Sequence, residues 1–329
     1  MPSEDIQRLQ STTKISQDAE SPSEESFFNN LPAEGLTLGR YENAHHYKDG
    51  LFSTVFVARM PLGSSQAQRD MASQASAVAL KVTTPSMMEA PHDSERECRL
   101  LRRAKSPNVI PLFEEFKQAG GRLVLAFPFM PYDLEQLLRE GKMSEAQKKS
   151  CLRDLLTGLD HIHGVGVVHR DIKPSNVLLR TPSGPAYVAD FGIAWCEDDA
   201  FSEPAAKKIL DVGTTSYRPP ELLFGNSSYG SSLDLWATGC VAAQVVSLGA
   251  ETLFDSGDLG SELALIKSIF QSLGTPTLEV WPEAATLPDW GKMAFHKYPT
   301  KPWSELLPDA SDQARDFVAR MALKHPYLV

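Results

Sequence analysis

The sequence predicts an α+β fold in which a β-rich N-terminal part precedes a larger helical part. Two patterns of apolar residues support this fold class. From Tyr41 onward the spacing is that of strands, as at Val55 and Val57. Beyond Asp133 the spacing becomes helical, and the leucines of residues 151–159 fall on one face of a helix. With 329 residues the chain is long enough for two lobes or two domains.

Composition divides the chain into three parts. Residues 1–35 are rich in Ser, Gln and Glu, and such a segment buries too little apolar surface to offset its ordering entropy, so we expect a disordered tail. Residues 36–130 form the predicted small lobe, and residues 131–329 form the larger one. Within the small lobe, the Ser- and Gln-rich residues 61–77 predict a long loop between adjacent strands.

Charge and cysteine content restrict the partners and the compartment. A net charge of −10 argues against a nucleic acid or an anionic membrane as the main partner. The longest uncharged stretch, residues 235–250, is shorter than the ~20 residues that span a bilayer, so it predicts a buried helix. The four cysteines form no CxxC pair, and the N-terminus has no signal-peptide pattern. We therefore expect a soluble protein with reduced thiols, cytoplasmic or nuclear or both.

Residues 169–176, which read HRDIKPSN, carry three polar groups at the spacing that phosphoryl transfer requires. Asp171 can accept the proton of an attacking hydroxyl, and Lys173 can neutralise charge on the moving phosphoryl group. Asn176 supplies a hard oxygen ligand for magnesium. A surface loop that happens to be rich in charge would explain this motif if it stood alone.

A second motif, DFG at residues 190–192, makes that alternative a poor one. Asp190 supplies another oxygen, so Asp190 and Asn176 together would hold a magnesium ion that bridges ATP phosphates. The two motifs resemble the catalytic and metal-binding loops of eukaryotic protein kinases. The resemblance covers roughly residues 41–327. It implies a two-lobed protein kinase fold, with a small antiparallel β-sheet lobe and a larger helical lobe, ATP and Mg²⁺ as cofactors, and a protein substrate.

The resemblance also implies the residues of the ATP site. Lys81 matches the strand lysine that holds the ATP phosphates, and Glu97 matches its ion-pair partner on the next helix. The implied catalytic set is Lys81, Glu97, Asp171, Lys173 and Asn176. The implied ATP-contacting set is Gly50, Val55, Ala79, Lys81, Phe127, Pro128, Met130, Asp133 and Leu178. An apolar stack of Leu101, Leu112, His169 and Phe191 is expected to couple the lobes.

The phosphate-covering loop departs from the kinase pattern. Of its glycines only Gly50 remains, while Lys48 and Ser53 replace the other two. Glycines let backbone N–H groups approach phosphates without a Cβ in the way. We therefore expect a bulkier loop and weaker ATP affinity.

Within the kinases, the chain most resembles the cyclin-dependent group, including its activating-kinase relatives. Residues 91–97 keep the Pro, Arg and Glu of the helix start that contacts a cyclin, so Pro91–Glu97 is the implied cyclin site. Residues 217–221 read YRPPE where the group has YRAPE. Lys173 and Thr214 are features of serine/threonine kinases, and Asp234 matches the aspartate that pins the catalytic loop.

Three departures from that group decide how far the resemblance carries, and the first two concern control of activity. Ile209 stands at the activation threonine and cannot carry a phosphate. Arg96 and Arg170 match two of the three arginines that would bind the phosphate, but the third position is Trp195. An apolar Ile209 near Trp195 would order the segment by packing; the alternative is a disordered segment and low activity.

The third departure lies near the C-terminus. Between Met321 and Ala322 the family has a further stretch that contains an arginine paired with Glu221, so the large lobe reads as shortened there. Leaving half of a buried ion pair costs ~3–5 kcal/mol unless another cation or water substitutes.

Two functions from different classes remain open at this point. The first is an active kinase that transfers the γ-phosphate of Mg-ATP to a protein serine or threonine, proline-directed or acting on other kinases. The second is a pseudokinase that acts as a binding scaffold. The intact set of polar catalytic residues favours the first. Arg218 and Gly213 imply a preference for proline after the target residue.

Overall fold

The computed structural model describes residues 34–61, 77–141, 143–247 and 251–323. Nearly all of the predicted N-terminal tail and nearly all of the predicted loop over residues 61–77 lie outside the described residues. The same holds for residues 324–329, so the predicted shortening near the C-terminus is only partly covered.

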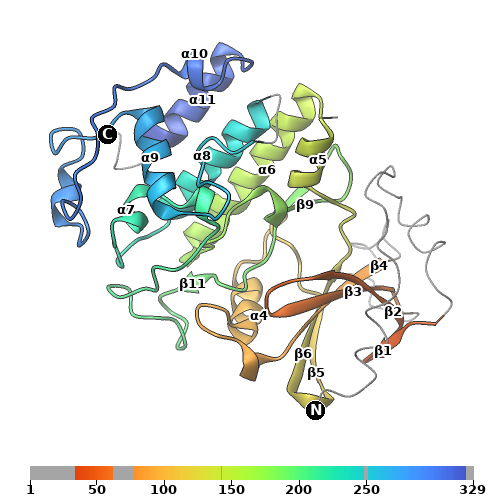
Figure 1. Ribbon diagram of the computed structural model, residues 1–329. Coiled ribbons are helices and arrows are strands. Elements are labelled where there is room, and N and C mark those ends of the chain that lie inside the picture. Colours follow the sequence, from red (N-terminus) through yellow and green to blue (C-terminus); the bar gives the residue numbers. More distant parts are fainter. Residues whose placement is uncertain (1–33, 62–76, 142, 248–250, 324–329) are drawn as a thin grey trace.

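The N-terminal lobe is a six-stranded antiparallel sheet, as predicted (Figure 1). Its strand order is β1-β2-β3-β4-β6-β5. The strands are β1 (Leu36–Leu38), β2 (Tyr41–Asp49), β3 (Ser53–Arg59), β4 (Ala77–Thr83), β5 (Glu114–Gln118) and β6 (Arg122–Pro128). Alternating burial along β4 places Val78, Leu80 and Val82 on one face of the sheet, where they share an apolar cluster, because successive side chains of a strand point to opposite faces.

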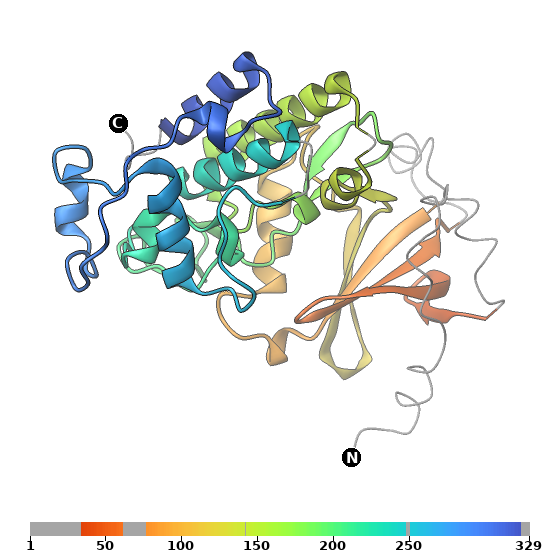
Figure 2. The same ribbon diagram turned by 45° about the horizontal axis from the view of Figure 1, so that its top comes forward.

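The α-helix α4 (Ser94–Arg103) lies beside this sheet. It begins at Asp93, whose side chain accepts a hydrogen bond from the backbone N–H of Arg96 at 2.8 Å. Leu100 and Leu101 on its apolar face pack in the main core with Leu125 of β6. Both views show α4 (orange) where the sheet meets the helical lobe (Figure 1; Figure 2).

The C-terminal lobe is mainly helical. Its helices are α5 (Leu134–Glu140), α6 (Glu145–Gly164), α7 (Pro220–Leu223), α8 (Ser232–Val246), α9 (Glu262–Leu273), α10 (Trp303–Leu306) and α11 (Asp312–Leu323). The predicted stripe over residues 151–159 lies on α6, and the uncharged stretch forms most of the buried helix α8. Among the described residues, no helix has the length and apolar character to cross a membrane.

Short strands at the junction of the lobes flank the two sequence motifs. They are β7 (Tyr132–Asp133), β8 (Val167–Val168), β9 (Val177–Leu179), β10 (Ala186–Val188) and β11 (Trp195–Cys196). Residues 169–176 connect β8 to β9, and residues 190–192 lie between β10 and β11. Because β9 pairs with β10 and β8 pairs with β11, the two motifs are held side by side.

Candidate active site

Asp171 is held by three neighbours that fix the direction of its carboxylate. Thr214 donates to Oδ1 from its backbone N–H at 3.0 Å and from its hydroxyl at 2.9 Å. Lys173 Nζ lies 2.9 Å from Oδ2 and also donates to the Thr214 hydroxyl at 2.9 Å. The side-chain amide of Asn176 donates to Oδ2 at 3.1 Å. Thr214 therefore contacts both Asp171 and Lys173, and the proton acceptor is pre-oriented.

The predicted Lys81–Glu97 ion pair forms and is joined by Asp190. Lys81 Nζ lies 2.8 Å from both carboxylate oxygens of Glu97 and 2.8 Å from Asp190 Oδ1. Burial lowers the pKa of Lys81, but the two carboxylates outweigh it and hold that pKa above its ordinary value. Attraction to the Lys81 ammonium keeps the pKa of Asp190 well below its usual range. Lys81 and Asp190 are therefore both charged at neutral pH.

The oxygens of Asp190 and Asn176 fit a magnesium ion. Asn176 uses its amide nitrogen on Asp171, which leaves its side-chain oxygen for a cation. The Asp190 side chain is half exposed, and only Oδ1 is shown bonded to Lys81. Gly192 keeps this corner open, because a Cβ there would lie 3.2 Å from Asp190 Oδ1. Two protein oxygens completed by phosphates and water suit Mg²⁺.

The implied adenine-contacting residues come from both lobes. Ala79 and Phe127 are register partners on β4 and β6, and Leu178 on β9 packs in the same apolar cluster. Pro128 ends β6, and Met130 follows it in the buried connection between the lobes. Val55 is paired with Lys81 across β3 and β4, and Asp133 with Leu178 across β7 and β9. The structure thus brings the implied ATP-contacting residues to the junction of the lobes.

Gly50 closes the β2–β3 hairpin that corresponds to the phosphate-covering loop. Its N–H donates to the carbonyl of Ser53 at 2.7 Å, and a Cβ on Gly50 would lie 2.8 Å from Ser53 Oγ. Lys48 and Ser53 occupy strand positions that flank this turn. The one retained glycine therefore stands where the turn is tightest.

Buried groups beneath the site fix the catalytic loop. Asp234 of α8 accepts hydrogen bonds from the backbone N–H groups of His169 at 2.8 Å and Arg170 at 2.9 Å, as expected from the sequence. His163 Nε2 lies 2.8 Å from the same carboxylate. Burial raises the pKa of Asp234, but these partners outweigh it and the pKa lies below its ordinary value. The His169 ring meets Phe191 edge-on at 4.9 Å, so this contact of the predicted stack is present.

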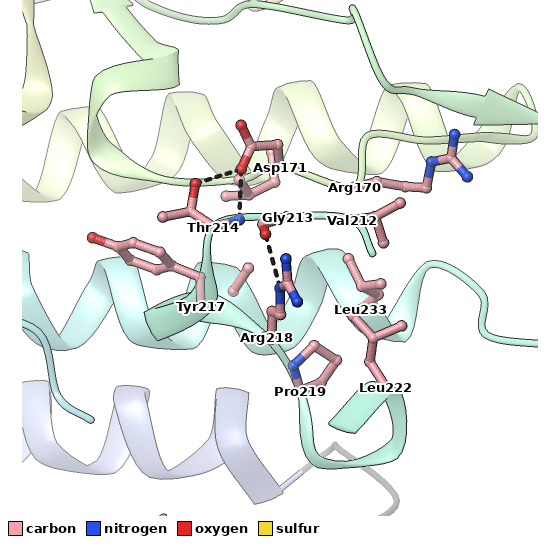
Figure 3. A pocket seen from close by; sticks show the side chains of 12 residues that line it. Arg170, Asp171, Val212, Gly213, Thr214, Tyr217, Arg218, Pro219, Leu222 and Leu233 are labelled. Carbon is pink, nitrogen blue, oxygen red and sulfur yellow. Dashed lines mark hydrogen bonds between the residues drawn. The ribbon is translucent and has the colours of Figure 1, made fainter. Parts of the chain in front are cut away.

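Gly213, Thr214, Tyr217 and Arg218 line a small pocket beside Asp171 (Figure 3). Gly213 adopts φ +74°, and Arg218 donates from Nε to its carbonyl at 2.9 Å. A Cβ on Gly213 would lie 2.8 Å from the carbonyl oxygen of Arg170, so only glycine fits without a shift. Arg218 also pairs with Asp211 and Glu262, each at 2.7 Å.

Ile209 and Trp195 order the activation segment, which we define as residues 190–221. Ile209 packs against an apolar cluster that includes Val212, Leu222 and Tyr229. Trp195 instead lies under the ammonium of Lys208, 4.3 Å from the ring centroid, and donates from Nε1 to a backbone carbonyl. The segment is therefore ordered by packing, as one alternative expected, but the two residues use different partners.

Two polar residues that hold the activation segment and the catalytic loop were not singled out in the sequence. Glu203 pairs with both Arg96 and Arg170, and His163 pairs with Asp234. Two arginines kept without a phosphorylatable threonine were the available signal for Glu203, because a buried cation requires an anion. His163 has no signal in the sequence, since a lone histidine in a helix is usually a packing residue.

A model of the protein kinase domain matches residues 64–328. This chain belongs to the protein kinase family. Serine/threonine-protein kinase csk1 of Schizosaccharomyces pombe is 34% identical over 280 residues, covering 84% of this chain and 86% of that protein. Cyclin-dependent kinase 20 of Homo sapiens is 35% identical over 240 residues, covering 72% of this chain and 66% of that protein.

Two solved structures share the fold of this kinase. A chain of the CAK complex from Chaetomium thermophilum, solved bound to ATP-gamma-S, gives a TM-score of 0.70 at 27% identity, covering 86% of this chain and 84% of that one. A chain of the yeast RNA Pol II CTD kinase CTDK-1 complex gives a TM-score of 0.69 at 26% identity, covering 88% of this chain and 90% of that one. The protein is thus a serine/threonine kinase that groups with the cyclin-dependent and CAK-like kinases.

Proposed function

We propose that this kinase transfers the γ-phosphate of Mg-ATP to serine or threonine residues followed by proline in a protein substrate. The hydrogen bond from Arg218 to the Gly213 carbonyl carries the proposal. It occupies the acceptor that a substrate N–H after the target residue would otherwise meet. A buried N–H without a partner costs about 1–3 kcal/mol, and proline has no N–H to lose.

Each polar group of the site has a separate role in phosphoryl transfer. Asp171 accepts the proton of the substrate hydroxyl, and Lys173 balances negative charge beside it. Lys81, held by Glu97, orients the nucleotide phosphates. Asn176 and Asp190 would hold Mg²⁺, which neutralises charge on the phosphate oxygens when bound. The completeness of this set favours the active kinase over the scaffold.

Matched peptides test the proline preference. Three peptides would carry Ser-Pro, Ser-Ala and Ser-(N-methyl-Ala) in an otherwise identical sequence. We expect kcat/KM to fall roughly 5–150-fold from Pro to Ala, which corresponds to the cost of one unpaired N–H. The N-methyl peptide lacks the N–H without the proline ring, so it should be phosphorylated nearly as well as the proline peptide. Equal rates for Pro and Ala would refute the preference.

A second candidate substrate is another protein kinase. Its support is the likeness to the CAK complex and to csk1. We also propose that a cyclin binds at residues 91–97, supported by the name of cyclin-dependent kinase 20 and by the complexes among the structural relatives. Comparing the purified chain alone with a cyclin-supplemented sample, on a catalytically inactive cyclin-dependent kinase as substrate, tests both.

Two further parts of the proposal concern organisation and location. We propose residues 36–130 and 131–329 as the two lobes, with the ATP site between them. The compartment is proposed as cytoplasm, nucleus or both, supported by the four cysteines, which are all free. Fractionation of cells that express the tagged chain checks this location.

A further inference from the structure

Two buried arginines meet at the inner side of the activation segment. Arg96 comes from α4 and is 4% exposed, while Arg170 comes from the catalytic loop and is fully buried. Each lies next to a residue of the active site, because Arg96 precedes Glu97 and Arg170 precedes Asp171. Two guanidinium groups repel each other in such a place and require an anion between them.

Glu203 supplies that anion from within the chain. Its Oε1 lies 2.9 Å from Nη1 of Arg170, and its Oε2 lies 3.7 Å from Nη1 of Arg96. Burial raises the pKa of Glu203, but attraction to the arginines outweighs it, so the pKa lies below the ordinary value. The carboxylate is therefore charged at neutral pH.

The backbone of Glu203 is fixed independently of its carboxylate. Its carbonyl accepts the Nε1–H of Trp195 at 2.8 Å. Trp195 occupies the place where the sequence comparison led us to expect a third arginine, and it stacks with Lys208. The tryptophan thus serves as an anchor for the residue that carries the anion.

We propose that Glu203 is a positioning residue whose carboxylate replaces the activation-segment phosphate and joins α4, the catalytic loop and the segment. Through Arg96 it holds the helix that carries Glu97. Through Arg170 it holds the backbone beside Asp171. The proposal goes beyond the proposed substrate preference but relies on the kinase activity for one of its readouts.

Two further ion pairs also connect α4 to the activation segment. Arg99 forms a bidentate pair with Asp199, at 2.7 and 3.0 Å, and Arg103 pairs with Asp198 at 2.6 Å. These pairs are more exposed than the Glu203 pair, so solvent screens them more. Glu203 is the carboxylate of this set that reaches both α4 and the catalytic loop.

Buried N–H donors without a hydrogen-bond partner indicate that the two arginines could bind an anion with more acceptor oxygens. Among the described residues, Arg96 Nε and Arg170 Nη2 are buried without a hydrogen-bond partner. Glu203 Oε2, 3.7 Å from Arg96, is likewise buried without a hydrogen-bond partner in the described part of the chain, so the carboxylate meets Arg96 as an ion pair and does not saturate the two guanidinium groups. The site therefore accepts a small anion when the glutamate side chain is removed.

The decisive variants are Glu203→Gln, which keeps the shape and removes the charge, and Glu203→Ala, which opens the space. The matched control is Glu197→Gln, an exposed carboxylate of the same segment. With myelin basic protein and ATP, we expect Glu203→Gln to lower kcat on the order of 5–150-fold, the range of a typical coupling between sites. The KM for ATP and the rate of the control should stay within about twofold of the wild type.

Chemical rescue separates positioning from simple stability. Acetate should restore much of the kcat of Glu203→Ala, whereas acetamide, which has the same shape without charge, should not. Wild-type kcat in Glu203→Gln overturns the proposal. A loss of activity fully explained by a lower folded fraction, with no acetate rescue, also overturns it.

A second readout does not need substrate phosphorylation. Limited proteolysis should cut residues 197–218 faster in Glu203→Gln than in Glu197→Gln, because the inner tie of the segment is lost. Equal cleavage rates contradict the proposal. If the wild type phosphorylates no protein, the kinase proposal fails while this comparison still decides the role of Glu203.

Discussion

The ring of Phe52 packs against the ring of His92, with centroids 4.7 Å apart and an angle of 52° between the planes. Phe52 lies at the tip of the β2–β3 hairpin, and His92 lies just before α4. The glycine-poor loop is therefore tied to the helix that carries Glu97. This contact adds a restraint to a loop in which the loss of two glycines has already reduced backbone freedom.

Phe52→Ala should raise the KM for ATP about 2–12-fold with little change in kcat. An aromatic pair contributes ~0.5–1.5 kcal/mol beyond its buried area, and the loop it holds covers the phosphates. Steady-state kinetics at varied ATP measure the effect. Leu51→Ala is the control, because Leu51 is a neighbour whose side chain is largely exposed. An unchanged KM in Phe52→Ala would show that the contact does not position the loop.

Asp171→Asn should reduce phosphoryl transfer by ~10²–10⁴-fold, because the variant cannot accept the hydroxyl proton. Nucleotide affinity should change little, since the bonds of Asp171 run to Thr214, Lys173 and Asn176. Radiolabel transfer and fluorescent-nucleotide titration measure the two quantities. Asp160→Asn, on the exposed side of α6, is the matched control. Full activity in Asp171→Asn would remove this residue from the mechanism.

Gly213→Ala should impair protein phosphorylation more than ATP binding. The positive φ costs on the order of 1–2 kcal/mol for a residue with a Cβ, and the Cβ would press on the Arg170 carbonyl. The backbone then moves the carbonyl that Arg218 occupies. Separate KM values for peptide and ATP, together with the melting temperature, check this. Gly164→Ala, where a Cβ meets open space, is the control. A raised KM for ATP with an unchanged KM for the peptide would contradict this prediction.

Phosphatase treatment should leave the rate of the purified kinase unchanged. Ile209 has no hydroxyl, and its side chain is already packed beside Tyr229 and Leu222. Mass spectrometry before and after treatment records which sites were phosphorylated. A large loss of rate that maps to Ser202 or Thr214 would prove this expectation wrong.

The Asp190 carboxylate should stabilise the fold above about pH 4 and lose that effect in acid. Its pKa in the folded chain is held below the ordinary value of 3.8, so the ionised form is favoured by folding. The free energy of unfolding of the wild type minus that of Asp190→Asn should be constant from about pH 5 to 8 and become less favourable to the wild type below about pH 4. Denaturant titrations across this range give the difference. A constant difference down to acid pH would contradict the assignment.

The residues of the two motifs could be predicted because phosphoryl transfer restricts them to few chemical types at fixed spacing. The Lys81–Glu97 pair was implied by the kinase resemblance and not by motif spacing, and the two side chains lie 2.8 Å apart. The strands of the small lobe follow from apolar spacing and the buried helix α8 follows from an uncharged stretch, and both patterns are visible in a single chain, whereas the antiparallel arrangement was implied by the kinase resemblance.

The control of the activation segment could not be predicted to the same depth. Its contacts join residues far apart in sequence, and several carboxylates in this acidic stretch compete as partners for Arg96 and Arg170. Only the fold selects Glu203, because the Trp195 indole fixes its backbone at the right distance. Likewise, nothing in the sequence placed Ile209 beside Tyr229, although its apolar character indicated that it would be packed.

All four cysteines of the chain are buried and unpaired, and they sit in different parts of the fold. Burial raises the pKa of the Cys98 and Cys151 thiols to about 12, so these side chains are protonated as well as covered. A thiol-specific reagent can therefore reach each sulfur only when its surroundings open. Cys98 lies on α4, whereas Cys151 lies on α6 and Cys240 on α8. The labelling rate of Cys98 therefore reports how often α4 moves away from its surroundings. The labelling rates of Cys151 and Cys240 report how often the helical lobe opens around α6 and α8.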